Sequence, residues 1–377
     1  MFELNEEHRM VALMVEEFAG REIEPVAAEN DRLGRFPGQL VEKMGRLGLM
    51  GMMVPPEYGG SGASAVSYVL AVEGIAYACP STAVTMSVNN LVCEPIMRYG
   101  TEAQKRGYLP GLATGGTLGA FALTEPGAGS DAASIATRAV RKGGAYVLNG
   151  RKVFITNGGY AGVFIVMART GGAPGAKGMS AFIVESGAPG LIVGKEERKM
   201  GLRASNTVEI AFEDCETPAG NLLGGEGDGF RIAMTALDGG RIGIAAQSLG
   251  IIRACFDEAV RYSRERRQFG KALARMQAVQ WMIADAARDL EAARLLVLHA
   301  AHLKDTGAAF TREAAVAKLF ASEAANRVAY DALQIHGGYG YVEPSKVERL
   351  YRDARVTTIY EGTSEVQRMV IANAVLR

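Results

Sequence analysis

The chain has 377 residues, of which 48% are hydrophobic and 22% charged, which is enough apolar material for two or three packed domains and argues against disorder. Lysine plus arginine and aspartate plus glutamate both number 41, so the balanced charge gives no sign of a nucleic-acid-binding protein. The start lacks a signal-peptide pattern, no apolar run is long enough to span a membrane, and the four cysteines lack metal-binding spacing, so we expect a cytoplasmic protein with buried thiols, no membrane insertion and no metal.

The first third of the chain has the apolar spacing of helices. Segments such as "EEHRMVALMVEEFAGREI" and "SAVSYVLAVEGIAYA" repeat apolar residues at three- and four-residue intervals. We therefore expect an N-terminal α-helical domain over residues 1–116.

Between residues 119 and 216 the pattern changes to short β-rich runs separated by glycine and proline. The pair Asn149-Gly150 lies between two such runs and predicts a tight hairpin turn. We expect a middle antiparallel β domain over residues 117–226.

Helical spacing returns after residue 227 in long segments. In "QAVQWMIADAARDLEAARLLVLHAAHLK" the residues Val279, Ile283, Ala286, Leu290, Ala293 and Val297 form one apolar face. We expect a C-terminal four-helix bundle over residues 227–377, and hence an α+β protein in the order α, β, α. This order excludes a parallel α/β sheet, and neither common phosphate-loop motif occurs.

Three glycine-rich or charged segments are candidates for binding. "FALTEPGAGSD" (121–131) combines small residues, whose backbone N–H groups can approach an anion, with the hydroxyls of Thr124 and Ser130, although such segments are usually only turns. "QIHGGYGY" (334–341) is typical of a helix C-cap, and we interpret His336 and Trp281 as packing residues. "RERRQFGK" (264–271) reads as a solvated helix end in which Phe269 is out of place.

A fourth segment, "VTTIYEGTSEVQR" (356–368), contains Glu361. Ser364 and Gln367 have the spacing of a capping box, and an acid before a helix N-terminus is favoured by the helix dipole. On this segment alone Glu361 is a structural residue.

Together, these segments resemble the acyl-CoA dehydrogenase family, and most closely its short-chain, butyryl-CoA members. "ALTEPGAGSDAAS" is similar to the flavin-loop signature, "QIHGGYGY" followed by "ERLYRD" to the C-terminal signature, and "IYEGTSEVQR" to the segment bearing the catalytic base. The resemblance covers nearly the whole chain. Phe154, where many members have tryptophan, and Pro344, where an acidic or amide residue is usual, depart from the pattern.

The resemblance implies that Glu361 removes the α-proton of an acyl-CoA thioester while the N5 atom of FAD accepts the β-hydride, which gives the trans-2-enoyl-CoA. Some members carry the base on the helix that here reads "LDGGRIGIAAQSLG", but Gly240 stands at that position. Burial would make Glu361 a better base by raising its pKa.

The resemblance also implies two sets of binding residues, and Arg266, Phe269 and Gln277 match positions that contact the FAD of a neighbouring subunit. The expected FAD contacts are Phe121, Leu123, Thr124, Gly129, Ser130, Phe154, Thr156, Arg266, Phe269, Gln277, Gln334, Gly337, Gly338, Thr363 and Glu365. The expected substrate contacts are Ser130, Asp238, Arg241, Tyr360 and Gly362, although a purely structural ion pair is an equal alternative for Arg241.

The family further implies a homo-oligomer, by default a tetramer, that passes electrons to an electron-transferring flavoprotein. We expect a short, unbranched acyl-CoA, and the absence of a basic residue from "TAVTMSVNN" (82–90) argues against a dicarboxylate substrate. Two alternatives stay open: an oxidase or hydroxylase of the same fold that uses oxygen, and a catalytically silent flavin-containing binding protein.

Overall fold

The computed structural model describes residues 3–376. The N-terminal part of the chain forms a helical domain. Its helices are α1 (Glu6–Phe18), α2 (Glu24–Leu33), α3 (Gly38–Arg46), α4 (Ala65–Ala78), α5 (Pro80–Tyr99) and α6 (Glu102–Ala113). Helices α4 and α5 are buried along most of their length because both pack against α7 of the C-terminal region. The N-terminal domain is thus not a separate body but one wall of a shared core.

The middle region forms one sheet with the strand order β6-β7-β3-β2-β4-β5-β8. Its strands are β1 (Leu118–Ala122), β2 (Arg138–Lys142), β3 (Ala145–Thr156), β4 (Ala161–Arg169), β5 (Met179–Glu185), β6 (Leu191–Glu196), β7 (Thr207–Pro218) and β8 (Leu222–Leu223). The sheet is mainly antiparallel, while β1 runs parallel to β4 beside the main path.

The predicted hairpin turn at Asn149-Gly150 is wrong. Both residues lie inside β3, and the turn between β2 and β3 is made by Gly143 and Gly144. The register with β7 shifts between Leu148 and Gly150, and a Cβ at Gly150 would lie 2.4 Å from the Oγ1 atom of Thr137. The glycine is needed for this close approach and not for a turn.

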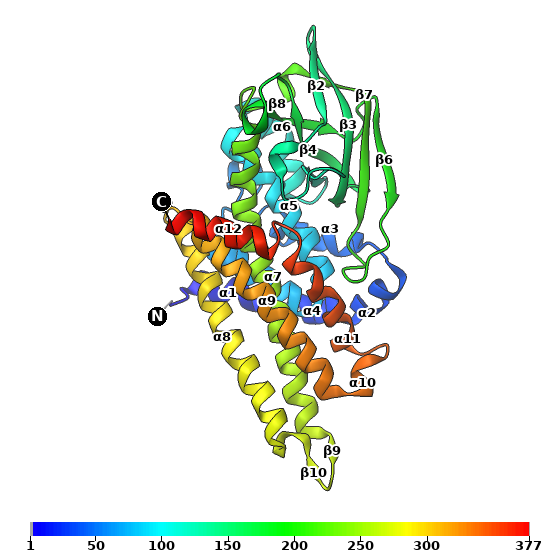
Figure 1. The fold of residues 1–377 in the computed structure, drawn as a ribbon, viewed down its shortest axis with the longest axis vertical. Helices are drawn as coiled ribbons and strands as arrows, with labels where there is room; N and C mark the ends of the chain where they lie inside the picture. Colours follow the sequence, from blue (N-terminus) through cyan, green and yellow to red (C-terminus); the bar gives the residue numbers. More distant parts are fainter. Residues whose placement is uncertain (1–2, 377) are drawn as a thin grey trace.

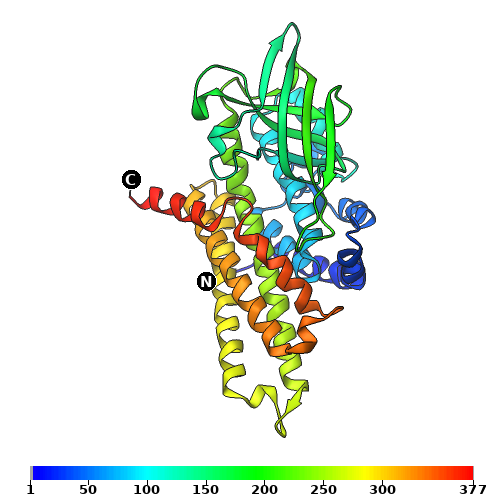
Figure 2. The same cartoon turned by 45° about the vertical axis from the view of Figure 1, so that its right-hand side comes forward.

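The C-terminal region is a helical bundle, as predicted. It comprises α7 (Gly229–Glu265), the hairpin β9 (Arg267–Gln268) and β10 (Lys271–Ala272), then α8 (Gln277–Asp305), α9 (Thr311–His336), α10 (Gly338–Tyr341), α11 (Lys346–Ala354) and α12 (Ser364–Val375). The sheet caps one end of the molecule, and the β9–β10 hairpin marks the other end (Figures 1 and 2). The α, β, α architecture expected from the sequence is confirmed.

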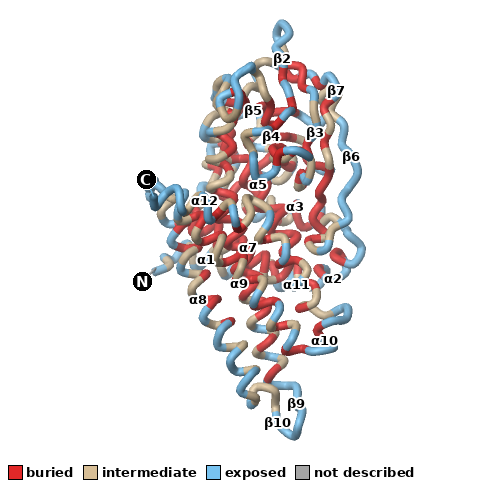
Figure 3. Tube along the Cα trace, viewed as in Figure 1, coloured by how far each residue is buried: buried red, intermediate tan, exposed pale blue. Residues whose placement is uncertain are grey.

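The core lies where α4, α5, α7 and α9 meet (Figure 3). The predicted apolar face of α8 faces this core, with Ala286, Leu290, Ala293 and Val297 buried. All four cysteines are buried and none forms a disulfide. Within residues 3–376, no helix combines the length and apolarity needed to cross a membrane.

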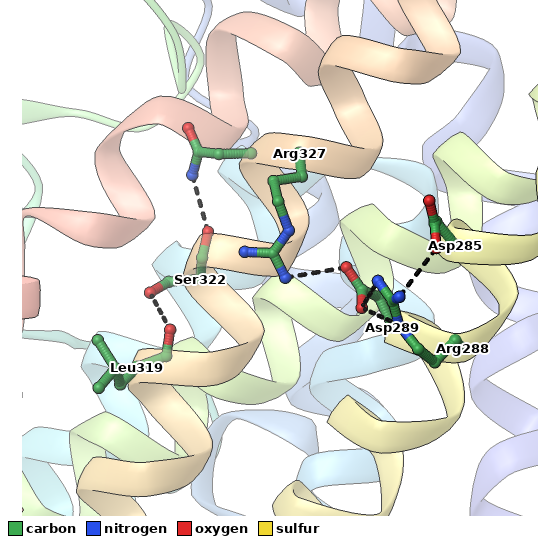
Figure 4. Close-up of polar contacts among 7 residues, drawn as sticks. Asp285, Arg288, Asp289, Leu319, Ser322 and Arg327 are labelled. Atoms are coloured by element: carbon green, nitrogen blue, oxygen red, sulfur yellow. Dashed lines mark hydrogen bonds and ion pairs between the residues drawn. The ribbon is translucent and has the colours of Figure 1, made fainter. Parts of the chain in front are cut away.

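One polar contact links α8 to α9. The carboxylate of Asp289 is almost fully buried and accepts hydrogen bonds at 2.9 Å from the guanidinium groups of Arg288, on the same helix, and Arg327, on α9 (Figure 4). Asp285, one turn earlier, pairs with Arg288 at the exposed surface.

Candidate active site

Glu361 lies in the loop that leads into α12, and its carboxyl group points into the protein. The Oε2 atom has no accessible surface and no hydrogen-bond partner, although the residue as a whole is only half-buried. A Cβ at Gly240, on α7, would lie 2.6 Å from Oε2, so the glycine leaves room for the acid. The carboxyl group expected to act as the base is therefore buried, unpartnered on one oxygen and adjacent to the helix that lacks an acid of its own.

The environment of Glu361 favours proton exchange near neutral pH. Burial raises its pKa from 4.5 to about 7, and the positive charges of Arg241 and Lys318 oppose this rise. Arg241, on α7, is buried and donates a 2.5 Å hydrogen bond to Asp238, whose other oxygen accepts one from Thr311. Arg241 thus has both a structural ion pair and an electrostatic effect on Glu361.

Two buried side chains hold the loop around Glu361 by its carbonyl groups. The Nζ atom of Lys318 donates to the carbonyl of Gly362 at 2.7 Å. The side-chain amide of Gln367 donates to the carbonyls of Glu361 and Gly362 at 3.1 and 2.9 Å. Glu361 has a φ of 53° and Gly362 a φ of 90°, so both residues occupy the left-handed region and need such support.

The predicted capping box of Ser364 and Gln367 is wrong. The N-cap of α12 is Thr363, whose hydroxyl accepts from the N–H of Val366. Gln367 turns back towards the loop instead. Tyr360, before Glu361, donates its hydroxyl to the side-chain carbonyl of Gln247 on α7.

A second group of predicted residues gathers on the β domain. Phe154 has a φ of 58° at an irregularity in β3, which leaves its ring 65% exposed. The neighbouring N–H of Val153 donates to the carbonyl of Thr124 at 2.9 Å, so strand and glycine-rich loop are joined. Thr156 is half-buried, and Phe121 is half-buried in β1. Leu123 is buried and could offer a ligand only its backbone.

The inner side of the glycine-rich loop is fixed by a buried ion pair. Lys152, on β3, is fully buried and donates to the Glu125 carboxylate at 2.7 Å. The other Glu125 oxygen accepts the N–H of Ala136 at 2.6 Å. On the outer side, a Cβ at Gly127 or Gly129 would meet no atom within 4 Å, and Ser130 is exposed. The loop is rigidly anchored but open towards a ligand.

A third group lies at the opposite end of the bundle, so one chain does not bring all predicted residues together (Figure 1). Phe269 is 93% exposed at the tip of the β9–β10 hairpin, and the Arg266 guanidinium lies 5.5 Å from the ring centre of Tyr339. The other members are Gln277 at the start of α8 and Gln334, Gly337 and Gly338 at the end of α9. Thr363 and Glu365 lie at the start of α12, next to Glu361.

Two packing predictions concern this end of the bundle. His336 is buried and stacks on Tyr262 with ring centres 4.2 Å apart, as expected of a packing residue. The prediction for Trp281 is wrong, because this side chain is 61% exposed on α8. The predicted glycine C-cap of α9 is confirmed at Gly337, whose N–H donates to the carbonyls of Leu333 and Gln334.

Sequence analysis missed the residues that support the site. Lys318 and Gln367 hold the loop of Glu361, and the Glu125–Lys152 pair holds the glycine-rich loop. One signal was present for Lys318, because it follows "EAAVA". Such a run of small residues is typical of a buried helix face, where a lysine is unusual.

Comparisons with known proteins cover the whole chain. Models of the N-terminal, middle and C-terminal domains of acyl-CoA dehydrogenases match residues 5–116, 120–215 and 227–376. An acyl-CoA dehydrogenase of Bacillus subtilis is 52% identical over 99% of both chains. The acryloyl-CoA reductase (NADH) of Anaerotignum propionicum is 50% identical over 100% of this chain and 96% of its own.

Solved structures agree with these matches. The butyryl-CoA dehydrogenase of Megasphaera elsdenii has a TM-score of 0.98 at 46% identity, with both chains fully covered. A chain from the structural work on the electron transferring flavoprotein of Acidaminococcus fermentans has a TM-score of 0.99 at 49% identity, again with both chains fully covered.

Proposed function

The chain belongs to the acyl-CoA dehydrogenase family, and on that premise we propose that it uses FAD to oxidise a short, unbranched acyl-CoA to the trans-2-enoyl-CoA. One observation carries the proposal: the Glu361 carboxyl is buried with one oxygen unpartnered and a pKa of about 7. A carboxylate of this kind can take a weakly acidic proton at neutral pH.

The residues of the β domain fit a flavin. The exposed Phe154 ring offers apolar surface to a planar ring system, Thr124 and Thr156 offer hydroxyls, and the open glycine-rich loop offers backbone N–H groups and Ser130 to a phosphate. When bound there, FAD supplies the acceptor for the β-hydride. Arg266, Phe269 and Gln277 belong to the β9–β10 hairpin region and the start of α8, which lie at the end of the bundle away from the sheet (Figure 1). We therefore propose that they complete the site of a neighbouring subunit.

The chain's own contribution to the reaction begins with the geometry of Glu361. Its carboxylate takes the α-proton, and its backbone N–H is the proposed donor to the thioester carbonyl, where negative charge develops. Gly362 lets the backbone approach the substrate closely. We propose that Tyr360, Asp238 and Arg241 border the thioester, and that the buried surroundings of Oε2 exclude water from the reacting proton.

We propose an electron-transferring flavoprotein as the electron acceptor, since one structural relative comes from work on such a protein. A second function has some support, because a relative of equal similarity is an NADH-dependent acryloyl-CoA reductase. The same site would then run in the opposite direction, with Glu361 returning a proton to the α-carbon. The oxygen-using alternative is supported by a less similar structural relative, a prolyl acyl carrier protein oxidase that is 34% identical. The buried Glu361 carboxyl argues against the silent alternative.

The test is the visible spectrum of the purified protein, recorded without oxygen before and after addition of butyryl-CoA. We expect flavin absorption that bleaches in the wild type and in Glu42→Gln, an exposed control on α3, but not in Glu361→Gln. Absence of flavin would contradict the proposal. Rapid reoxidation by oxygen would favour the oxidase, and NADH consumption with acryloyl-CoA would favour the reductase.

A further inference from the structure

A lysine side chain is buried beside the candidate base. Lys318 lies on α9 and its side chain has no accessible surface. The residues one turn away on the same face are small: Ala314, Ala315, Ala321 and Ser322. Burying an ammonium group is costly unless nearby groups compensate it. Within residues 3–376, no carboxylate lies close enough to Lys318 for an ion pair. The position therefore calls for an explanation other than an ordinary salt bridge.

The contacts of Lys318 point to the loop of Glu361. Its Nζ atom donates to the carbonyl of Gly362 at 2.7 Å, one residue after the acid. The carboxyl group of Glu361 is near enough to favour the charged form of Lys318, while burial lowers the pKa of this lysine to about 8. In return, the ammonium group favours the charged form of Glu361.

We propose that Lys318 is a positioning residue of the reaction: it fixes the Gly362 carbonyl so that Glu361 keeps its left-handed conformation, and it supplies the charge that keeps this buried acid available as a carboxylate. The inference rests on the proposed role of Glu361. It assigns two tasks to one side chain, and the structure provides a means of separating them.

Gln367 allows the two tasks of Lys318 to be separated. Its amide donates to the same Gly362 carbonyl at 2.9 Å, and it is as fully buried as Lys318, but it carries no charge. Loss of Gln367 removes support from the loop alone, whereas loss of Lys318 removes support and charge together. Neither side chain donates a hydrogen bond to the Glu361 carboxyl, so the charge of Lys318 is the difference between them that acts directly on the proton affinity of Glu361.

Other groups that face Glu361 stay the same in both variants. Arg241 faces it from α7, Tyr68 from α4 and Tyr360 from its own loop. Arg241 is paired with Asp238, and Glu323 and Glu365 face Lys318 from α9 and α12. A difference in the titration of Glu361 between the two variants therefore reports on Lys318.

The experiment compares Lys318→Met, Lys318→Arg and Gln367→Met in the flavin-loaded protein. The rate of flavin reduction by butyryl-CoA is measured against pH, and the Glu361 carboxyl is titrated by infrared difference spectroscopy against Glu361→Gln. We expect Lys318→Met to move both midpoints upward by about one pH unit. We expect Lys318→Arg to keep the wild-type midpoints, and Gln367→Met to lower the rate without moving them.

A midpoint in Lys318→Met equal to that of Gln367→Met and the wild type would overturn the inference. If Lys318→Met does not fold, which circular dichroism reveals, Lys318→Gln provides the neutral variant, and Lys142→Met at the exposed end of β2 is the control for the loss of a lysine charge. If no acyl-CoA reduces the wild-type flavin, the proposed function fails, yet the infrared titration still decides whether Lys318 sets the proton affinity of Glu361.

Discussion

The Glu361 carboxyl group lies where burial disfavours its charged form, and this makes stability depend on pH. Its pKa is 4.5 when solvated and about 7 in the fold, so between these values the folded state binds more protons than the unfolded state. Wild-type stability should therefore fall as pH rises from 4.5 to 7, and the loss is complete above pH 7. Glu361→Gln has no such proton to lose.

We predict that the free energy of unfolding of Glu361→Gln, relative to that of the wild type, increases by about 1–3 kcal/mol when the pH is raised from 4.5 to 8. Urea unfolding at both pH values measures the difference. Asp353, also buried with a pKa raised to about 7, changes both proteins equally and cancels. An equal difference in stability at the two pH values would contradict a raised pKa of Glu361.

Gly240 provides a second prediction at this scale. Alanine favours a helix over glycine by about 1 kcal/mol, but a Cβ at position 240 would lie 2.6 Å from the Oε2 atom of Glu361 and 2.7 Å from Leu91. We expect Gly240→Ala to destabilise the protein by about 1–3 kcal/mol through overpacking and to slow flavin reduction at least roughly tenfold through displacement of the carboxylate.

Gly107 on α6 is the matched control, because a Cβ there would meet nothing within 4 Å. We expect Gly107→Ala to stabilise the protein slightly and to leave the rate unchanged. Thermal unfolding and the rate of flavin reduction measure both variants. A Gly240→Ala protein that reacts like Gly107→Ala would mean that the acid does not need this space.

Sequence could suggest some residues of the site but not others. A local signature drew attention to Glu361, since the acid, the glycine after it and the following helix start are neighbours in the chain. Lys318 lies 44 residues from the carbonyl that it contacts, so only the packing of α9 against the loop brings the two together. The N-cap was misplaced by one residue because both Thr363 and Ser364 are suitable caps, and the backbone decides between them.

At the scale of elements, periodicity predicted helices well and strands less precisely. The apolar faces of α7, α8 and α9 repeat over many turns, so their signal is strong. In β3 the Asn149-Gly150 pair suggested a turn, although Gly150 serves a close approach to Thr137 within a continuous strand. A two-residue motif does not distinguish these cases, because the partner that needs the space is distant in sequence.

The link between α8 and α9 yields a prediction at this scale. Asp289 is buried and bonded to Arg288 and Arg327, whereas Asp285 is exposed on the same helix (Figure 4). We expect Asp289→Asn to cost about 1–3 kcal/mol, because a buried carboxylate loses its charge-assisted hydrogen bonds to two arginines. Asp285→Asn should change stability by less than about 0.5 kcal/mol.

Urea unfolding of the two variants measures this difference. Arg327→Met offers an independent check, since it leaves one oxygen of Asp289 without its partner on α9. Equal stabilities of Asp289→Asn and Asp285→Asn would show that the buried pair contributes no more than a surface pair. The bundle would then depend on its apolar face alone.

At the scale of the whole molecule, the proposed binding residues fall into two separate groups. Phe154 lies near the inner end of β3, next to α5, because the Asn157 amide that follows this strand donates to the carbonyl of Thr85. The β9–β10 hairpin lies at the far end of the bundle (Figures 1 and 2), and this region carries a group of exposed large apolar side chains. This group comprises Phe269, Trp281, Tyr339, Tyr341 and Val342. Exposed apolar side chains gathered in one region are typical of an interface, and we propose that a second copy of the chain covers this group.

Phe269 is the sharpest probe of this arrangement, because it is 93% exposed and lies at the hairpin tip in the left-handed region, so it contributes little to the packing of its own chain. We propose that Phe269 acts on the flavin site of a neighbouring subunit. On that proposal, we expect Phe269→Ser to leave unfolding of the flavin-free chain nearly unchanged, to reduce bound flavin at least roughly tenfold, and to shift the protein towards smaller assemblies. Analytical ultracentrifugation and flavin absorbance measure both effects. Val140→Ser, at an exposed apolar position of β2, should change neither. A Phe269→Ser protein that keeps its assembly and its flavin would place the whole flavin site within one chain, and the apolar group at the far end would then need another partner.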